Sequence, residues 1–150
     1  MNSWRHKADR FQQLDGPSRR LVLGSAVLLP LFWARVKLLG RCSLGQHHAD
    51  GAMRLQGDAA SLDAAAHMGR LVNSVAHFVL PADNCLTRSL YLQWLLRRRG
   101  ILGDLLLGVQ LENGQLRAHA WVEVAGYPVN DAQDVAERFL PFERSLSAQP

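Results

Sequence analysis

An Asn-Gly pair between two apolar runs is the sequence feature that most constrains how this chain can fold. Asn113 and Gly114 form the strongest short signal for a two-residue β-hairpin turn, because both residues tolerate the positive φ angles that the turn requires. Residues 104–111 and 115–124 are strand-like and flank this pair directly. The pattern predicts an antiparallel hairpin. Both of its faces are largely apolar, so we expect the sheet to be covered on both sides.

The hairpin turn also determines which residues lie opposite each other. A two-residue turn pairs Glu112 with Gln115. Counting along the strands then places Gly108 opposite His119. Because Gly108 has no side chain, we expect a gap there over which a thiolate or a peptide backbone can approach.

A helix with a cysteine in its first turn precedes the hairpin. Apolar residues recur with helical period after Cys85, and Gly100 stands where a helix commonly ends. Asp83 and Asn84 are both good N-cap residues. The helix dipole and the free backbone N–H groups there favour a negative sulfur and lower the pKa of the thiol. The same N–H groups can form part of an oxyanion hole, with Asn73 or Asn84 as its side-chain donor.

Cys85, His119 and Asp131 together have the residue types of nucleophilic catalysis. A thiol is a weak nucleophile until an imidazole holds it as a thiolate, and a carboxylate fixes the tautomer and orientation of that imidazole. Each residue alone is more often core filler. Their order, with the cysteine opening a helix and the other two in successive strands, is that of papain-like and transglutaminase-like enzymes. Asn130 is the alternative orienting residue, since papain-like enzymes can use an asparagine.

A second turn decides whether Asp131 can reach His119. We predict a three-residue loop over residues 124–126 with Gly126 in the left-handed region, because it places Asp131 directly opposite His119. A two-residue turn would place Asp131 on the other face of the sheet. Pro128 lacks a backbone N–H, so the third strand is expected at an edge or interrupted.

Three short segments resemble the lasso-peptide leader peptidases, which are transglutaminase-like cysteine peptidases related to the microcin-processing protein. The segments are Cys-Leu-Thr-Arg-Ser-Leu at 85–90, Leu-Leu-Arg-Arg-Arg-Gly-Ile at 95–101 and His-Ala-Trp-Val-Glu at 119–123. The resemblance is strongest over residues 68–140. It implies a peptidase that removes the leader from a lasso precursor, with Cys85 as the nucleophile, His119 as its partner and Asp131 as the orienting carboxylate.

The resemblance also implies partners. Leader recognition in this family is done by a small winged-helix-like domain, fused or separate, which contains a three-stranded sheet. Residues 1–80 look helical, so we expect a separate leader-recognition protein, with an ATP-dependent lasso cyclase acting on the product. No cofactor or metal is expected, because the histidines form no motif with ligand spacing. They are His47, His48, His67 and His77.

The expected fold is α+β. A papain/transglutaminase-like core at residues 68–150 has its catalytic cysteine on a helix N-terminus packed on a small antiparallel sheet, and a helical region at residues 1–67 precedes it. A chain of 150 residues is long enough for one core. Its two cysteines, Cys42 and Cys85, do not indicate a disulfide framework, which fits a cytoplasmic enzyme.

Residues 21–33 are nearly all apolar, and Ser18 is expected to cap a helix that starts at Arg19. Thirteen residues are fewer than the ~20 that a membrane span needs, and Pro30 lies among them. We expect a helix that faces the core or a partner, with membrane association through residues 21–33 as the alternative.

Two side chains near the histidine have competing interpretations. Arg88 lies one helical turn after Cys85, where it can support the thiolate or pair with Glu123. Trp121 is expected to be a packing residue rather than a platform for substrate.

Three functions compete. A peptidase and a transglutaminase-type acyl transferase share one triad and differ in whether water or an amine resolves the thioester, so only the resemblance favours hydrolysis. A non-catalytic adaptor would not need an intact set of cysteine, histidine and aspartate. Nucleic-acid binding is disfavoured, because the net charge of +4 is small and its basic residues are scattered.

Overall fold

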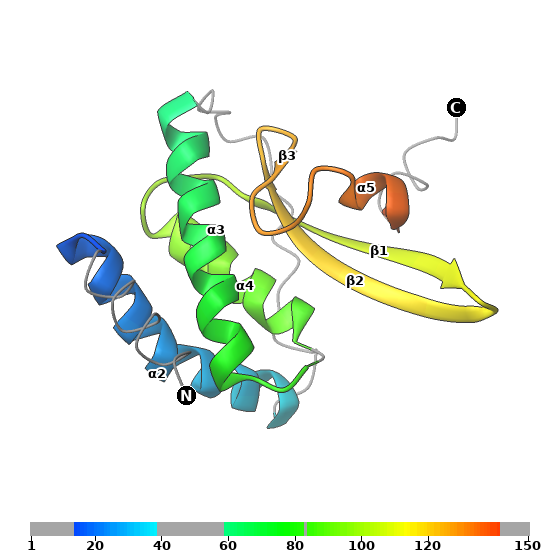
Figure 1. The fold of residues 1–150 in the computed structure, drawn as a ribbon, viewed down its shortest axis with the longest axis horizontal. Coiled ribbons are helices and arrows are strands. Elements are labelled where there is room, and N and C mark those ends of the chain that lie inside the picture. The colour runs from blue at the N-terminus through cyan, green and yellow to red at the C-terminus, as the bar shows by residue number, and fades with distance from the viewer. Residues whose placement is uncertain (1–13, 39–58, 83, 142–150) are drawn as a thin grey trace, which may run out of the picture.

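The computed structural model describes residues 14–38, 59–82 and 84–141. Its elements, in chain order, are α2 (Gly16–Leu38), α3 (Ala59–Val79), α4 (Cys85–Arg97), β1 (Asp104–Glu112), β2 (Gln115–Val124), β3 (Tyr127–Pro128), α5 (Val135–Arg138) and β4 (Leu140–Pro141). The three long helices lie together, and the β1–β2 hairpin extends away from them with β3 and α5 above it (Figure 1). The predicted α+β class is confirmed.

Helix α3 lies at the centre of the hydrophobic core. It ends at Val79, two residues before Pro81. Its residues Ala65, Met68 and Val72 are almost fully buried and follow the i, i+3, i+7 spacing of one helix face. They share one core with buried residues of α2, α4 and the base of the sheet. The boundary predicted between residues 67 and 68 lies within this helix, and the division into two regions stays a prediction.

Helix α2 is longer than predicted. It begins at Gly16 and runs through Pro30 to Leu38. Ser18 lies inside its first turn rather than at its cap, and the Ser18 hydroxyl is 3.0 Å from His67 Nε2. The cap prediction was therefore wrong. The helix is also long and apolar enough to cross a membrane by length and composition, with a mean hydropathy of 1.6. Core helices and signal sequences pass the same test, so this property assigns no location.

Only one side of α2 faces the core. Leu21 and Leu29 are buried, and the buried hydroxyl of Ser25 accepts a hydrogen bond from Tyr91. The opposite side carries apolar side chains that remain largely exposed. These are Leu23 at 59%, Val27 at 66% and Leu31 at 60% exposed, and we call them the outer α2 strip. The core-facing expectation therefore holds for one face of the helix, which carries the buried residues Ser18, Leu21, Ser25 and Leu29.

The sheet has the strand order β3-β2-β1-β4. The predicted hairpin register is confirmed, since Glu112 pairs with Gln115 and Gly108 with His119. Both turn residues have positive φ angles, 52° at Asn113 and 77° at Gly114. This register places His119 close to the base of the hairpin, beside α4.

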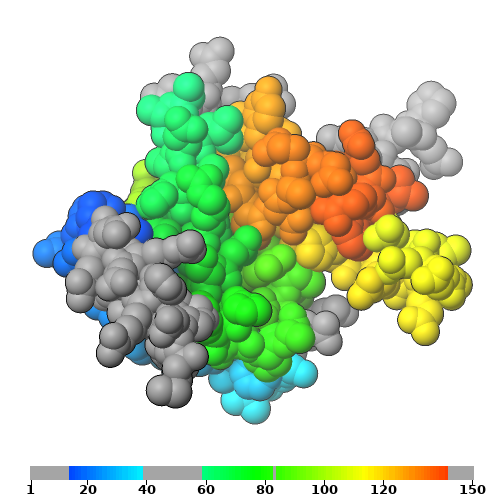
Figure 2. Space-filling model, viewed as in Figure 1, coloured from blue at the N-terminus to red at the C-terminus, as the bar shows by residue number. Residues whose placement is uncertain are grey.

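The outer half of the hairpin contradicts the prediction that both faces are covered. Leu111 is 72% and Leu116 71% exposed, and the yellow hairpin end protrudes from the body of the molecule in Figure 2. The strands are longer than the layer of helices, and α4 packs mainly on β2, which is buried from residue 120 to residue 124. The helices therefore cover only the base of the hairpin.

The second turn also differs from the prediction. Val124 pairs with Tyr127 and Glu123 with Pro128, so the turn has two residues rather than three. Ala125 takes a φ of 52° in spite of its side chain, next to Gly126 at 83°. Strand β3 is at the edge of the sheet, as Pro128 indicated, and it ends after this proline.

Candidate active site

Cys85 is the first residue of α4 and is partly buried. Asn84 occupies the N-cap position, but its side chain donates to the carbonyl of Pro81 and makes no cap hydrogen bond. A hydrogen bond with His119 is the main reason why the pKa of the Cys85 thiol lies below its ordinary value. Burial opposes the shift, and the backbone N–H groups of Ala120 and Leu86 reinforce it. The first turn of α4 thus favours a thiolate.

His119 lies between this thiol and a carboxylate. Its Nε2 is 2.7 Å from Asp131 Oδ2, which leaves Nδ1 as the ring nitrogen for Cys85. The bond to Asp131, followed by the bond to Cys85, raises the pKa of His119 from 6.5 to about 9 against the opposing effect of burial. The imidazole ring stacks on Phe139 at 4.7 Å between ring centroids. The pair therefore favours thiolate and imidazolium over thiol and neutral imidazole.

Asp131 carries more contacts than a triad requires. Burial raises the pKa of its carboxyl, but the bond with His119, the backbone N–H of Ala132 and the charge of Arg88 outweigh burial and lower it. Arg88 and Arg138 each place a guanidinium nitrogen 3.5 Å from this carboxylate. Arg88 thus pairs with Asp131. The sequence analysis had suggested instead that it supports the thiolate or pairs with Glu123.

The contact of Asp131 with His119 arises from a bend rather than from the predicted register. The Val129 N–H still donates to the Val122 carbonyl, at 3.0 Å, as the next step of the β2–β3 ladder. The chain then leaves the strand, so the alternation of side chains across the sheet no longer holds. The two-residue turn consequently does not turn Asp131 away from His119. We call residues 129–134, which include this bend, the site loop.

Asn130 anchors the bend. Its Oδ1 accepts a hydrogen bond from the Val122 N–H at 2.8 Å, where a strand would offer a backbone carbonyl. Its Nδ2 donates to Ser89 Oγ at 2.9 Å, and its own carbonyl accepts from Asn73 Nδ2 at 2.7 Å. Asn130 is 3% exposed. It holds the site loop, while Asp131 contacts His119.

Ser89 is a residue that sequence reasoning missed. It is fully buried, donates to the Ala120 carbonyl at 3.0 Å and accepts from Asn130. Its place four residues after Cys85, on the same face of α4, is the signal that pointed toward the site. One hydroxyl therefore connects the cysteine helix, the histidine strand and the site loop.

Gly69 gives the site loop room to pack on α3. A side chain added there would overlap the backbone carbonyl of Val129 and lie 3.2 Å from the Cα of Asn130. The close approach of helix and loop therefore requires glycine at this position.

The gap predicted above Gly108 is filled. A side chain at Gly108 would come within 3.0 Å of Phe139 and of the Trp121 ring. The expected path for a thiolate or a peptide backbone over this glycine was therefore wrong. Phe139 instead covers one side of the His119 ring, and sequence reasoning did not identify it.

Trp121 is confirmed as a packing residue. It is fully buried, and its indole N–H donates to Glu123 Oε1 at 2.8 Å. Glu123 is 7% exposed. The indole thus gives the buried Glu123 carboxylate a hydrogen-bond donor. The sequence analysis had suggested this carboxylate as a partner for Arg88.

The candidate oxyanion donors and metal ligands are engaged elsewhere. The side-chain amides of Asn73 and Asn84 donate to the backbone carbonyls of Asn130 and Pro81. Within the described ranges, no three His, Cys, Asp or Glu side chains are placed to hold a metal ion. Four of the residues named earlier, at 42, 47, 48 and 83, lie outside these ranges.

Comparison with known proteins places this geometry in a family. The family model of the Transglutaminase-like superfamily matches residues 27–144, which include the candidate site and most of the chain. The searches of curated proteins and of solved structures returned no match. Members of this superfamily are generally cysteine peptidases or acyl transferases. The chain belongs to the transglutaminase-like superfamily.

Proposed function

We propose that this protein is a cysteine peptidase that removes the leader from a lasso-peptide precursor, with Cys85, His119 and Asp131 as its catalytic residues. The observation that supports it best is the 2.7 Å hydrogen bond between His119 and Asp131, next to a Cys85 thiol whose pKa His119 lowers. Cleavage of a peptide bond needs a nucleophile and a proton donor for the leaving amine. Thiolate and imidazolium supply both.

The reaction follows from this arrangement. The Cys85 thiolate attacks the scissile carbonyl carbon, and the bond electrons move to the oxygen, which the N–H groups at the start of α4 can stabilise. Collapse of this intermediate breaks the C–N bond, and the amine leaves with the proton of His119. His119 then takes a proton from water, whose hydroxide attacks the thioester and releases the leader carboxylate and the Cys85 thiolate. Asp131 keeps the ring oriented throughout.

An acyl transferase is the second candidate, since the superfamily contains both kinds of enzyme. In that reaction, an amine rather than water attacks the same thioester. The three segments that resemble the leader peptidases favour hydrolysis and the lasso precursor. Mass spectrometry separates the two, because hydrolysis adds one water to the cleaved products and transfer yields a new amide.

The proposal includes a separate leader-recognition protein and an ATP-dependent lasso cyclase, all in the cytoplasm. The outer α2 strip is the surface that we assign to the leader-recognition protein, because its three large apolar side chains are all more than half exposed. We expect weak cleavage of the precursor by this chain alone and strong acceleration when the partner is added. Equal rates with and without the partner would contradict the proposed dependence on a separate leader-recognition protein.

The decisive experiment is incubation of the precursor and the leader-recognition protein with wild-type protein or with Cys85→Ala, followed by mass spectrometry. We expect a free leader with the wild type and intact precursor with Cys85→Ala, while circular dichroism shows the same fold for both. Normal cleavage by Cys85→Ala would refute the peptidase.

A further inference from the structure

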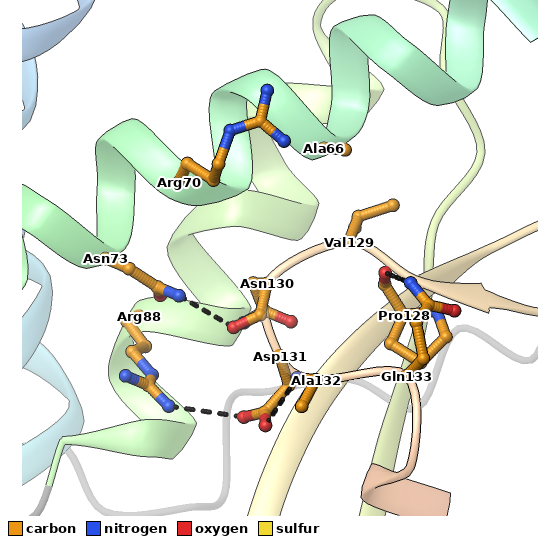
Figure 3. A pocket seen from close by; sticks show the side chains of 10 residues that line it. All are labelled: Ala66, Arg70, Asn73, Arg88, Pro128, Val129, Asn130, Asp131, Ala132 and Gln133. Carbon is orange, nitrogen blue, oxygen red and sulfur yellow. Dashed lines mark hydrogen bonds and ion pairs between the residues drawn. The ribbon is translucent and has the colours of Figure 1, made fainter.

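A cavity opens beside Asp131, on a side of this residue that the proposed reaction does not use. It has a volume of about 490 Å³ and lies between α3, α4 and the site loop (Figure 3). Its polar walls come from Arg70 and Asn73 on α3, Arg88 on α4 and Gln133 in the site loop. Asp131 is thus both a wall of this cavity and the partner of His119.

The two arginines leave positive charge in the cavity. The Arg70 guanidinium has no hydrogen-bond or ion-pair partner within residues 14–38, 59–82 and 84–141. Among the described residues, Arg88 makes one long contact, 3.5 Å, with Asp131, and its side chain is 24% exposed. Asp131 is already paired with His119 and with Arg138. Since a guanidinium has five N–H donors, both Arg70 and Arg88 retain capacity for a second carboxylate.

The cavity wall also contains an acceptor without a donor. Asn73 uses its Nδ2 to hold the Asn130 carbonyl, whereas its buried Oδ1 has no hydrogen-bond partner in the described part of the chain. Buried polar atoms are nearly always paired in folded proteins. Because this oxygen has almost no exposed surface, a ligand in the cavity does not reach it, and the capacity of the cavity to bind a carboxylate comes from Arg70 and Arg88.

We propose that this cavity is a substrate subsite that binds an acidic side chain of the cleaved peptide, with Arg70 and Arg88 contacting its carboxylate. The inference rests on the proposed peptidase function and adds the chemistry of a substrate residue to it. Asp131 is separated from Cys85 only by the His119 ring. An extended peptide advances ~3.3 Å per residue, so the acidic residue lies within a few positions of the scissile bond.

The test uses the precursor itself and the leader-recognition protein. After mass spectrometry has located the cleaved bond, each Asp or Glu near it is changed singly to Asn or Gln. One of these replacements should lower kcat/KM by ~10- to ~100-fold, the usual effect of losing a hydrogen bond to a charged group. Arg70→Gln should lower kcat/KM by a similar factor and reduce the difference between the acidic and the amidated precursor, to which Arg88 then contributes alone.

Two further variants sharpen the test. Arg70→Glu should prefer a precursor in which the same acidic residue is replaced by Lys, because the charges are exchanged. Arg97→Gln is the matched control, since Arg97 is an exposed arginine in the last turn of α4 and lies outside the cavity. It should cleave the acidic and the amidated precursor with the wild-type ratio.

The outcomes separate the subsite from the peptidase. If no amidated precursor is cleaved more slowly, or if the loss is undiminished in Arg70→Gln, the subsite is refuted while the peptidase stands. A rate loss in Arg70→Gln that no precursor position shares would show that Arg70 contacts the partner protein, which also refutes the subsite. If the wild type cleaves no precursor, the proposed function fails first and the subsite fails with it.

Discussion

Asp131→Asn is the substitution that tests the catalytic set most directly, because it removes one charge and keeps the size of the side chain. The bond between Asp131 and His119 is the first cause of the rise in the His119 pKa from 6.5 to about 9. At pH 7.5, a histidine with a pKa of about 9 is almost fully protonated, whereas one near 6.5 is about nine-tenths neutral. Loss of the carboxylate therefore lowers the pKa of His119 and removes part of the imidazolium that protonates the leaving amine, although Cys85 still raises that pKa.

We expect kcat/KM to fall by a larger factor than the loss of imidazolium alone would cause. The variant also loses the carboxylate that orients the ring, and an amide can present its NH₂ group to Nε2 and favour the wrong tautomer. We expect kcat/KM for precursor cleavage to fall by ~100- to ~10 000-fold, the range for loss of a general acid or its orienting carboxylate. Mass spectrometry over time, with the leader-recognition protein in excess, measures it.

The pH profile distinguishes a catalytic from a structural role for Asp131. The rate rises with pH as Cys85 loses its proton and falls as His119 loses its own. Because the pKa of Cys85 is lowered and that of His119 is raised, the wild type should have a broad plateau that ends near pH 9. In Asp131→Asn the pKa of His119 falls, so the alkaline limb should move to lower pH.

Asp134→Asn is the matched control. Asp134 lies three residues away, is 56% exposed and pairs only with Arg138 at 3.2 Å among the contacts that the structure describes. An exposed pair of this kind contributes little, so its loss should change kcat/KM by about twofold at most. A folded Asp131→Asn variant with wild-type kcat/KM and an unmoved alkaline limb would refute the assigned role.

Three other predictions concern the framework of the site. Ser89→Ala should lower the free energy of unfolding in urea by about 1–3 kcal/mol and reduce turnover, because it leaves buried partners unpaired; unchanged stability would contradict the network. Gly69→Ala should displace the site loop and lower kcat/KM, whereas Gly24→Ala, with open space around it, should not; equal effects of the two would contradict the packing argument. The third prediction compares the thermal stability of Cys85→Ala with that of Cys85→Ala/His119→Gln. Both variants lack the Cys85 thiol, whose lowered pKa would change stability with pH in the opposite direction. In this background the bond to Asp131, the first cause of the shift, still raises the folded-state pKa of His119, so only the variant that keeps His119 should lose thermal stability as pH rises above about 6.5; parallel melting curves would contradict it.

The hairpin could be predicted from sequence because its determinants are local. The Asn113-Gly114 pair specifies the turn, the turn specifies the register, and the register places His119 opposite Gly108. The start of α4 was predictable for the same reason, since cap residues and an apolar stripe lie side by side in the sequence. The hairpin and the start of α4 were therefore located correctly, whereas the Ser18 cap at the start of α2 was not.

The second turn and the exposed half of the hairpin depend on distant contacts. Ala125 adopts a positive φ, which is unusual for a residue with a side chain. The side-chain oxygen of Asn130 accepts the hydrogen bond that a backbone carbonyl of the neighbouring strand would otherwise accept. Neither event has a local signature, and the position of Asn130 depends on partners in α3 and α4. The contact of Asp131 with His119 was predicted through a register that was wrong, which shows that residue chemistry was a better guide here than strand counting.

The three proposed catalytic residues lie on different elements, yet one buried network positions them. Ser89 is on the helix that begins with Cys85, its hydroxyl donates to the residue after His119, and it accepts from the residue before Asp131. A shift of α4 therefore moves the nucleophile together with the carbonyl and the amide that position its two partners. Binding at the neighbouring cavity would act on the same framework through Asn73, which holds the Asn130 carbonyl. An acidic peptide residue seated there would therefore contact the residues that orient Asp131, so its loss should lower kcat as well as raise KM.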